Sequence, residues 1–420
     1  MGQTLSEPVT NKETASCGNS FAKVASSSMQ GWRINMEDAH THLLSLPDDK
    51  DASFFAVYDG HGGPRVSQYA GQHLHKKITQ TDAYRRGDVD NALKDGFLAL
   101  DADMLRDDDM KDEMAGTTAI AVLIKNNRIY CANVGDSRAV VSEGGLVQPL
   151  SYDHKPANDE EARRIIAAGG WVEFNRVNGN LALSRALGDF VFKKNEQKPP
   201  EEQIVTACPE VLSREIAGDV EFIVLACDGI WDVMSNQEVV DFCRDRIGAN
   251  KEPAQVCEEL LTRCLAPDCQ MGGLGCDNMT VVLVCLLQGR SWEQFVAACN
   301  RPRPSTPPPD LGEPDEFVDE DEEQLGHAAA ADAAADQRRQ HDQQRPPATQ
   351  APAASAEFAE ETPADHAIAP LKEGGGADQS PPAPKREPTV RPAPQQAEAV
   401  AVESPPCDPA PSGGLADNSQ

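Results

Sequence analysis

Short apolar runs alternate with amphipathic stretches between Phe21 and Leu287. Where apolar residues recur at helical spacing, we predict helices, and these segments are 64–78, 89–106, 158–168 and 235–247. Where the apolar run is continuous and of strand length, we predict buried strands with the turns that end them, in FFAVYDG (54–60), TTAIAVLIKNN (117–127), RIYCANVGD (128–136), EFIVLACDG (221–229) and NMTVVLVCLL (278–287). Neighbouring strands at 117–142 read as antiparallel, so the pattern favours an α+β fold with helix-covered sheets over a doubly wound parallel sheet.

Local signals mark several turns and helix ends. Asn126-Asn127 separates two of the apolar runs and predicts a tight hairpin. Ser235 with Glu238 fits a capping box, and Ser291 with Gln294 fits another that predicts a short helix over 291–300.

The pattern of apolar positions is lost at both ends of the chain. Residues 301–420 hold 21 of the 31 prolines and no Trp or Tyr, which predicts a disordered, acidic Pro/Ala-rich tail unable to bury enough apolar surface to offset its chain entropy. The first twenty residues are polar and are predicted to be a flexible segment. One globular domain is therefore expected over 21–290.

Charge and cysteine content narrow the function classes. A formal net charge of -30 argues against nucleic-acid binding and against broad adhesion to anionic membranes. No apolar run is long enough to span a bilayer, and the N-terminus lacks the apolar core of a secretory signal. Twelve cysteines without a C-x-x-C pair are typical of buried thiols in a reducing compartment, so we expect a cytoplasmic protein, with the nucleus also open. A zinc site at Cys264, Cys269 and Cys276 lacks a convincing fourth ligand.

Acidic residues stand where apolar strands enter or leave the predicted core. They are Glu37, Asp38, Asp59, Asp136, Asp228 and Asp277. A single Asp-Gly after a strand is usually a turn, but several such endings weaken that interpretation. If the strand ends gather on one rim, the crowded carboxylates repel each other, and raised pKa values or bound divalent cations relieve the repulsion. Oxygen ligands without His or Cys favour Mg²⁺ or Mn²⁺, and glycines at 60 and 229 leave the backbone carbonyls accessible.

Seven segments resemble the metal-dependent Ser/Thr protein phosphatases of type 2C, in the family's order and spacing. They are MQGWRINMEDAH (29–40), FFAVYDGHGG (54–63), GTTAIAVLI (116–124), ANVGDSRAV (132–140), LALSRALGDF (181–190), LACDGIWDV (225–233) and CDNMTVVLV (276–284). Together they are highly specific and cover about 21–290.

The resemblance implies a four-layer αββα sandwich, in which two mainly antiparallel sheets are flanked by helices and a cleft holds two Mn²⁺ or Mg²⁺ ions. By resemblance, Asp59 bridges the two ions. The other implied ligands are the Gly60 carbonyl, Asp228, Asp277, Glu37 (directly or through water) and Asp38 (directly or in support of a ligand). Arg33 is expected to hold the substrate phosphate and His61 to protonate the leaving oxygen. Asp136 and Asp232, with Asp228, match a weaker third metal site.

The implied activity is hydrolysis of phosphoserine and phosphothreonine in proteins by a metal-bridging hydroxide, without a phosphoenzyme. A non-catalytic phosphoprotein-binding homologue and a metal-binding structural protein are the alternatives. Arg33 could instead pair with Glu37, and Arg185 fits a loop staple better than a phosphate contact. Residues 165–195 are predicted to form a mobile flap beside the cleft. No feature favours an obligate oligomer, so a monomer is expected.

Both chain ends carry short motifs. Met1–Ser6 fits the N-myristoylation pattern at Gly2, and a single acyl chain gives only weak, reversible membrane contact. PPAPKR (381–386) fits an SH3 ligand, with simple disordered spacer as the default. Four Ser/Thr-Pro pairs could be phosphorylated by proline-directed kinases, at Thr306, Thr362, Ser380 and Ser404.

Overall fold

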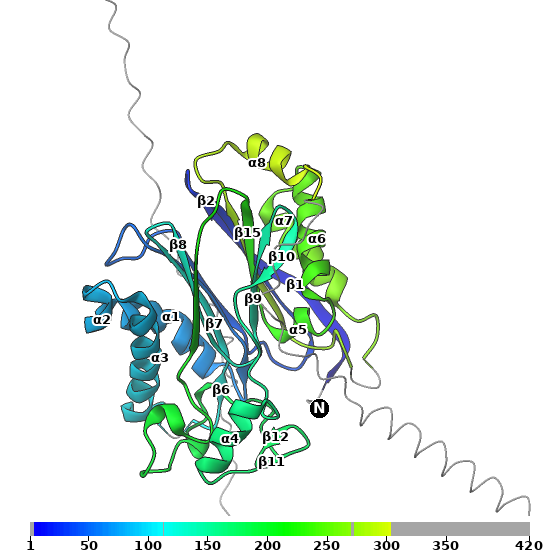
Figure 1. Cartoon of the computed structure of the whole chain (residues 1–420). Helices are drawn as coiled ribbons and strands as arrows, with labels where there is room; N and C mark the ends of the chain where they lie inside the picture. Colours follow the sequence, from blue (N-terminus) through cyan, green and yellow to red (C-terminus); the bar gives the residue numbers. More distant parts are fainter. Residues whose placement is uncertain (1–3, 112, 270–272, 304–420) are drawn as a thin grey trace, which may run out of the picture. The chain divides into compact units, whose positions relative to one another are not determined.

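The computed structural model describes residues 4–111, 113–269 and 273–303. Two antiparallel sheets form its centre (Figure 1). The first has the order β1(Thr4–Gly18)-β2(Ala22–Arg33)-β16(Met279–Leu286)-β15(Val220–Ala226)-β9(Arg138–Glu143)-β10(Leu146–Pro149). The second has the order β14(Glu210–Glu215)-β8(Arg128–Val134)-β7(Ala119–Lys125)-β4(Ser53–Tyr58)-β3(Ala39–Leu43).

The two sheets pack face to face, with helices on both outer faces. The core between them includes Val57 and Val122 from the second sheet and Ile223 and Val282 from the first. The outer layers are α1(Arg65–Gln80) and α3(Val89–Arg106) on the second sheet, and α6(Asn236–Gly248) and α7(Pro253–Cys264) on the first (Figure 1). Central strands therefore have no polar face, which explains their continuous apolar runs. The predicted four-layer αββα sandwich is confirmed.

Smaller elements complete the described part. The helices are α2(Asp82–Arg85), α4(Asp159–Ala167), α5(Asp228–Trp231), α8(Trp292–Cys299), η1(Phe190–Phe192) and η2(Pro200–Glu202). The short strands are β13(Leu187–Gly188), β6(Gly116–Thr117) and β5(Gly60–His61) in one sheet, and the hairpin β11(Val172–Glu173) and β12(Arg176–Val177). None of the described helices is long and apolar enough to cross a membrane.

The local turn and cap signals are confirmed. Asn126 and Asn127 both have left-handed φ angles, 52° and 57°, as the tight turn between β7 and β8 requires. Both capping boxes form, at Ser235 of α6 and at Ser291 of α8. The predicted helix at 291–300 is thus observed as α8.

The prediction of a flexible segment at 1–20 is wrong for the described residues. Thr4–Gly18 forms strand β1, which pairs antiparallel with β2 along most of its length. An edge strand with one solvated face needs few apolar residues, because the backbone hydrogen bonds to its neighbour hold it. Here Cys17 packs against the core and Thr14 Oγ1 lies 2.9 Å from Ser27 Oγ.

The cysteine prediction needs one correction. Nine described cysteines are free and most are buried, as expected for small apolar side chains. Cys269 and Cys276, however, are joined in a disulfide, which also removes the zinc alternative. The seven-residue separation closes a loop that brings their Cα atoms within 6.0 Å, a geometry that the spacing alone did not predict.

The two helix glycines of the α1–α3 pair provide a test of packing against propensity. A Cβ on Gly96 would lie 2.6 Å from Ile78 Cγ1 and 2.9 Å from Ile78 Cα, whereas one on Gly71 would meet atoms only at 3.7 Å or beyond. Gly96→Ala should therefore lower the free energy of unfolding by about 1–3 kcal/mol. Gly71→Ala should raise it by up to about 1 kcal/mol through helix propensity. Urea unfolding followed by circular dichroism measures both; stabilisation by Gly96→Ala would contradict the packing.

Candidate metal centre and phosphate site

The antiparallel registers bring the acidic strand ends to one place. In the first sheet, the beginning of β16 pairs with the end of β15, Val281 opposite Ala226, and Met279 lies opposite Met29 near the end of β2. Asp277, just before β16, and Asp228, just after β15, therefore share an edge. In the second sheet, Ala39 at the beginning of β3 lies opposite Tyr58 at the end of β4, which brings the adjoining Asp38 and Asp59 together.

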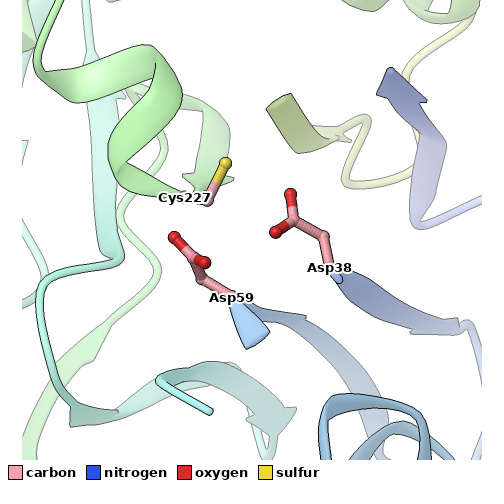
Figure 2. A group of neighbouring side chains, drawn as sticks. All are labelled: Asp38, Asp59 and Cys227. Atoms are coloured by element: carbon pink, nitrogen blue, oxygen red, sulfur yellow. The ribbon is translucent and has the colours of Figure 1, made fainter. Parts of the chain in front are cut away.

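Figure 2 shows the centre of this rim, where three side chains turn toward one another. A carboxylate oxygen from Asp38, one from Asp59 and the Cys227 sulfur all lie within 4.8 Å of one another. Burial and the neighbouring charges of Asp228, Asp38 and Asp277 raise the pKa of Asp59 well above its usual range. Burial and the charges of Asp136, Asp277 and Asp232 do the same to the pKa of Asp228.

Asp38 has an oxygen without a partner. Its Oδ2 accepts a 2.7 Å hydrogen bond from Thr280 Oγ1, whereas its Oδ1 is buried and has no hydrogen-bond partner. Burial raises the pKa of this carboxyl to about 7. A buried, unsatisfied carboxylate oxygen is costly unless it meets a cation, so this donor set fits a hard divalent ion. The Cys227 thiol donates to the Asn278 carbonyl, and burial raises its pKa, so it lies here as a neutral thiol.

The two Asp-Gly pairs require glycine for close packing. A Cβ on Gly60 would lie 2.2 Å from the Glu37 carbonyl oxygen, and one on Gly229 would lie 2.2 Å from the Asn278 carbonyl oxygen. These contacts hold the Glu37 segment and the beginning of β16 against the strand ends. The sequence predicted open backbone at both positions, and the structure adds this steric reason.

Asn278 is a positioning residue that sequence reasoning missed. Its Oδ1 accepts from the Glu37 backbone N–H at 2.9 Å, and its Nδ2 donates to the carbonyls of Gln30 and Asn35. One buried amide thus fixes the loop that carries Glu37 beside Asp277. The only sequence signal for a role of Asn278 was its position directly after Asp277, a predicted metal ligand.

Arg33 lies at the mouth of this cluster, with 39% of its side chain exposed. Its Nη2 donates to Asp277 Oδ2 at 2.5 Å. The alternative pairing with Glu37 is not the one observed. A half-exposed guanidinium beside the carboxylates can reach an incoming anion from solvent.

His61 pairs with a residue far away in the sequence. Its Nε2 lies 2.7 Å from Asp189 Oδ2, and Asp189 is buried with a left-handed φ of 50°. Burial lowers the pKa of His61, but the charge of Asp189 and its hydrogen bond raise the pKa by more than burial lowers it. The net shift is therefore upward. Asp189 is the next-to-last residue of the LALSRALGDF segment, yet nothing in that motif predicted its partner.

The carboxylates matched to a third metal site lie beside a lysine. Asp136 is buried and accepts a 2.6 Å bond from Lys155 Nζ. Burial and the charge of Asp136 raise the pKa of Asp232, although the Lys155 charge opposes this. Lys155 was not among the predicted residues.

Two further predictions concern the neighbouring segment. Arg185 binds Glu161 at 2.7 Å and the Cys208 carbonyl at 3.2 Å, so its predicted role as a loop staple is confirmed. The 165–195 stretch contains the β11–β12 hairpin, and its mobility stays a prediction. Gly2, the SH3-ligand pattern and the Ser/Thr-Pro sites lie outside the described residues.

Comparison with known proteins agrees with this geometry. A family model described as protein phosphatase 2C matches residues 22–271. A probable protein phosphatase 2C of Caenorhabditis elegans is 65% identical over 302 residues, which cover 72% of this chain and 85% of that protein. Protein phosphatase 2C homolog 2 of Schizosaccharomyces pombe is 51% identical over 300 residues, covering 70% and 81%. A crystal structure of a phosphatase from a pathogenic strain of Toxoplasma gondii has a TM-score of 0.55 at 27% identity, covering 66% of this chain and 95% of that one.

The helix-covered double sheet with its carboxylate rim, together with these matches, places the chain among the protein phosphatases. The chain belongs to the protein phosphatase 2C family, and the predicted family and enzyme class, protein-serine/threonine phosphatase, are confirmed.

The His61–Asp189 pair gives a prediction on pH. Asp189→Asn should lower the pKa of His61, because the carboxylate is the largest influence that raises it. With a raised folded pKa, the pair stabilises the fold fully below the ordinary histidine pKa, and this contribution is lost as the pH rises through the raised value. NMR titration of the His61 ring in metal-free protein measures the shift. An unchanged pKa in Asp189→Asn would show that the pair is electrostatically unimportant.

Proposed function

We propose that this phosphatase depends on two Mn²⁺ or Mg²⁺ ions and hydrolyses phosphoserine and phosphothreonine in proteins without a phosphoenzyme. The observation that carries the proposal is the carboxylate cluster at the strand ends, where Asp38 and Asp59 bring carboxylate oxygens within 4.8 Å of each other and the buried Oδ1 of Asp38 has no hydrogen-bond partner. Its donors are oxygens, the ligands that these hard cations prefer.

The residues that would hold the ions are the acidic residues at the neighbouring strand ends. Asp59 directly follows β4 and would contribute to holding both ions, since Asp38, Asp228 and Asp277 are all its electrostatic neighbours. The Gly60 carbonyl, Glu37 and Asp38 would complete the set on the side of the second sheet. When bound, two such metal ions would supply hydroxide near neutral pH and would offset the charge on the phosphoryl oxygens.

Arg33 would bind the substrate phosphate. Its planar guanidinium suits phosphate oxygens, and its exposed position lets substrate reach it. The pair with Asp277 holds the guanidinium beside the rim before substrate arrives. Arg33, which the pair with Asp277 holds beside the carboxylates, would thus bind and orient the phosphate.

His61 would protonate the leaving Ser or Thr oxygen. A serine or threonine alkoxide is a poor leaving group, so a proton donor is needed as the P–O bond breaks. The Asp189 carboxylate orients the ring and favours its protonated form. The imidazolium therefore begins the step with the proton that it must give.

The chain ends contribute further proposals that rest on sequence alone. We propose a cytoplasmic or nuclear monomer, with weak reversible membrane contact where Gly2 is myristoylated. Partners that bind SH3-ligand motifs or phosphorylate Ser/Thr-Pro sites would act on the tail.

Removal of Asp59 tests the metal assignment. Asp59→Asn should reduce Mn²⁺-dependent phosphate release from a phosphothreonine peptide by more than about 100-fold, since loss of a group that merely supports a metal ligand costs 10–100-fold. The metal-free variant should unfold at the same temperature as the parent or higher, because one of several repelling carboxylates is gone. Asp49→Asn, at an ion pair with Lys125 away from the rim, is the control. EDTA should abolish parental activity; phosphopeptide binding without turnover would instead support a non-catalytic homologue.

Replacement of His61 separates proton transfer to the leaving group from the other contributions to catalysis. His61→Gln should slow turnover of a phosphothreonine peptide by about 10²–10⁴-fold. It should affect p-nitrophenyl phosphate much less, because p-nitrophenolate leaves without a proton. Steady-state rates on both substrates decide the matter, and equal losses would exclude the general-acid role.

A further inference from the structure

Within the described residues, the outer part of the rim already carries a cation of the protein's own. Lys155 Nζ donates to Asp136 Oδ2 at 2.6 Å. The Asp136 side chain is 9% exposed, whereas that of Lys155 is 36% exposed. The ammonium is thus inserted from the solvent side onto a buried carboxylate.

A series of hydrogen bonds holds the segment that carries Lys155. The His154 N–H donates to the Gly135 carbonyl at 3.0 Å, and Asn133 Nδ2 donates to the Tyr152 carbonyl at 2.8 Å. Arg138 binds both oxygens of Asp153, at 2.9 and 2.8 Å. Residues 152–155 are therefore fixed alongside 133–138, and Lys155 is held in position beside Asp136.

The same ammonium acts on the other two carboxylates of this outer group. Asp228 is one of the acidic charges that it faces, together with Asp136 and Asp153. For Asp232, Lys155 is the strongest charge acting on it. One positive charge is thus hydrogen-bonded to Asp136 and acts electrostatically on Asp228 and Asp232.

We propose that Lys155 is the resident cation of this third carboxylate site, and that a third Mn²⁺ or Mg²⁺ ion binds there only by displacing the ammonium from Asp136. The inference rests on the proposed two-metal function. It adds a reason why the third site would bind its ion more weakly than the two inner sites bind theirs. An ammonium and a divalent ion held on one carboxylate repel each other, so the two are expected to compete for Asp136. At the inner pair Arg33 holds Asp277 in a similar way, but within the described residues no Lys or Arg forms an ion pair with Asp38 or Asp59.

Lys155→Met tests the displacement on the full-length chain. Titration with Mn²⁺, with free ion counted by electron paramagnetic resonance, should still show two tight sites, which gain less affinity than the third because Lys155 is hydrogen-bonded to Asp136 and acts on their ligand Asp228 only through its charge. A third site should bind about 10–100-fold tighter than in the parent, because a hydrogen bond between charged groups contributes on that order. Lys155→Gln should behave likewise, and Lys155→Arg, which retains the charge, should resemble the parent. Adding Asp136→Asn to Lys155→Met should remove the gained affinity.

Lys125→Met is the matched control, because Lys125 pairs with Asp49 away from the rim. It should leave all Mn²⁺ affinities unchanged. A third site that is unchanged or weaker in folded Lys155→Met and Lys155→Gln, with the two tight sites intact, would overturn the inference and make Lys155 a support for Asp136. Two ions at every Mn²⁺ concentration in all variants would overturn it equally. If the parent binds no ion tightly, the proposed function fails as well.

Discussion

Repulsion among buried carboxylates is the constraint on which the rest of this structure depends. The sandwich brings Asp59 and Asp228 together because their strands end at one edge, and burial removes the water that would screen them. Part of the charge is offset within the protein, by Arg33 on Asp277 and by Lys155 on Asp136. Within the described residues, the carboxylates of Asp38 and Asp59 have no such ion pair. The raised pKa values of Asp38 and Asp59 show that repulsion is left there for a bound cation to relieve.

The sandwich keeps this arrangement from relaxing. A core of interdigitated apolar side chains fixes the spacing of the two sheets, so the strand ends cannot move apart to lower the repulsion. Close backbone contacts at Gly60 and Gly229 and the three hydrogen bonds of Asn278 fix the connecting loops as well. The rigid core thereby holds the carboxylates at the strand ends close together, although they repel each other.

The sequence predicts what depends on strand ends and misses what depends on contacts across the fold. Asp59 and Asp228 were found because each directly follows an apolar strand, a pattern that the chain shows locally. The pairing of His61 with Asp189 spans 128 residues and relies on a left-handed backbone at Asp189, so no local pattern contains it. Strand β1 was missed because an edge strand can be polar and still pair through its backbone.

Arg33 connects the metal centre with the phosphate site through one shared carboxylate. Asp277 accepts a hydrogen bond from Arg33, and on the proposed function the same carboxylate is a metal ligand. A cation on Asp277 draws electron density from it and weakens its hold on the guanidinium, since the two positive groups compete for the same oxygens. The guanidinium then has donors available for a phosphate. Occupancy of the metal centre and readiness of the phosphate site are therefore expected to rise together, because both depend on the charge of Asp277.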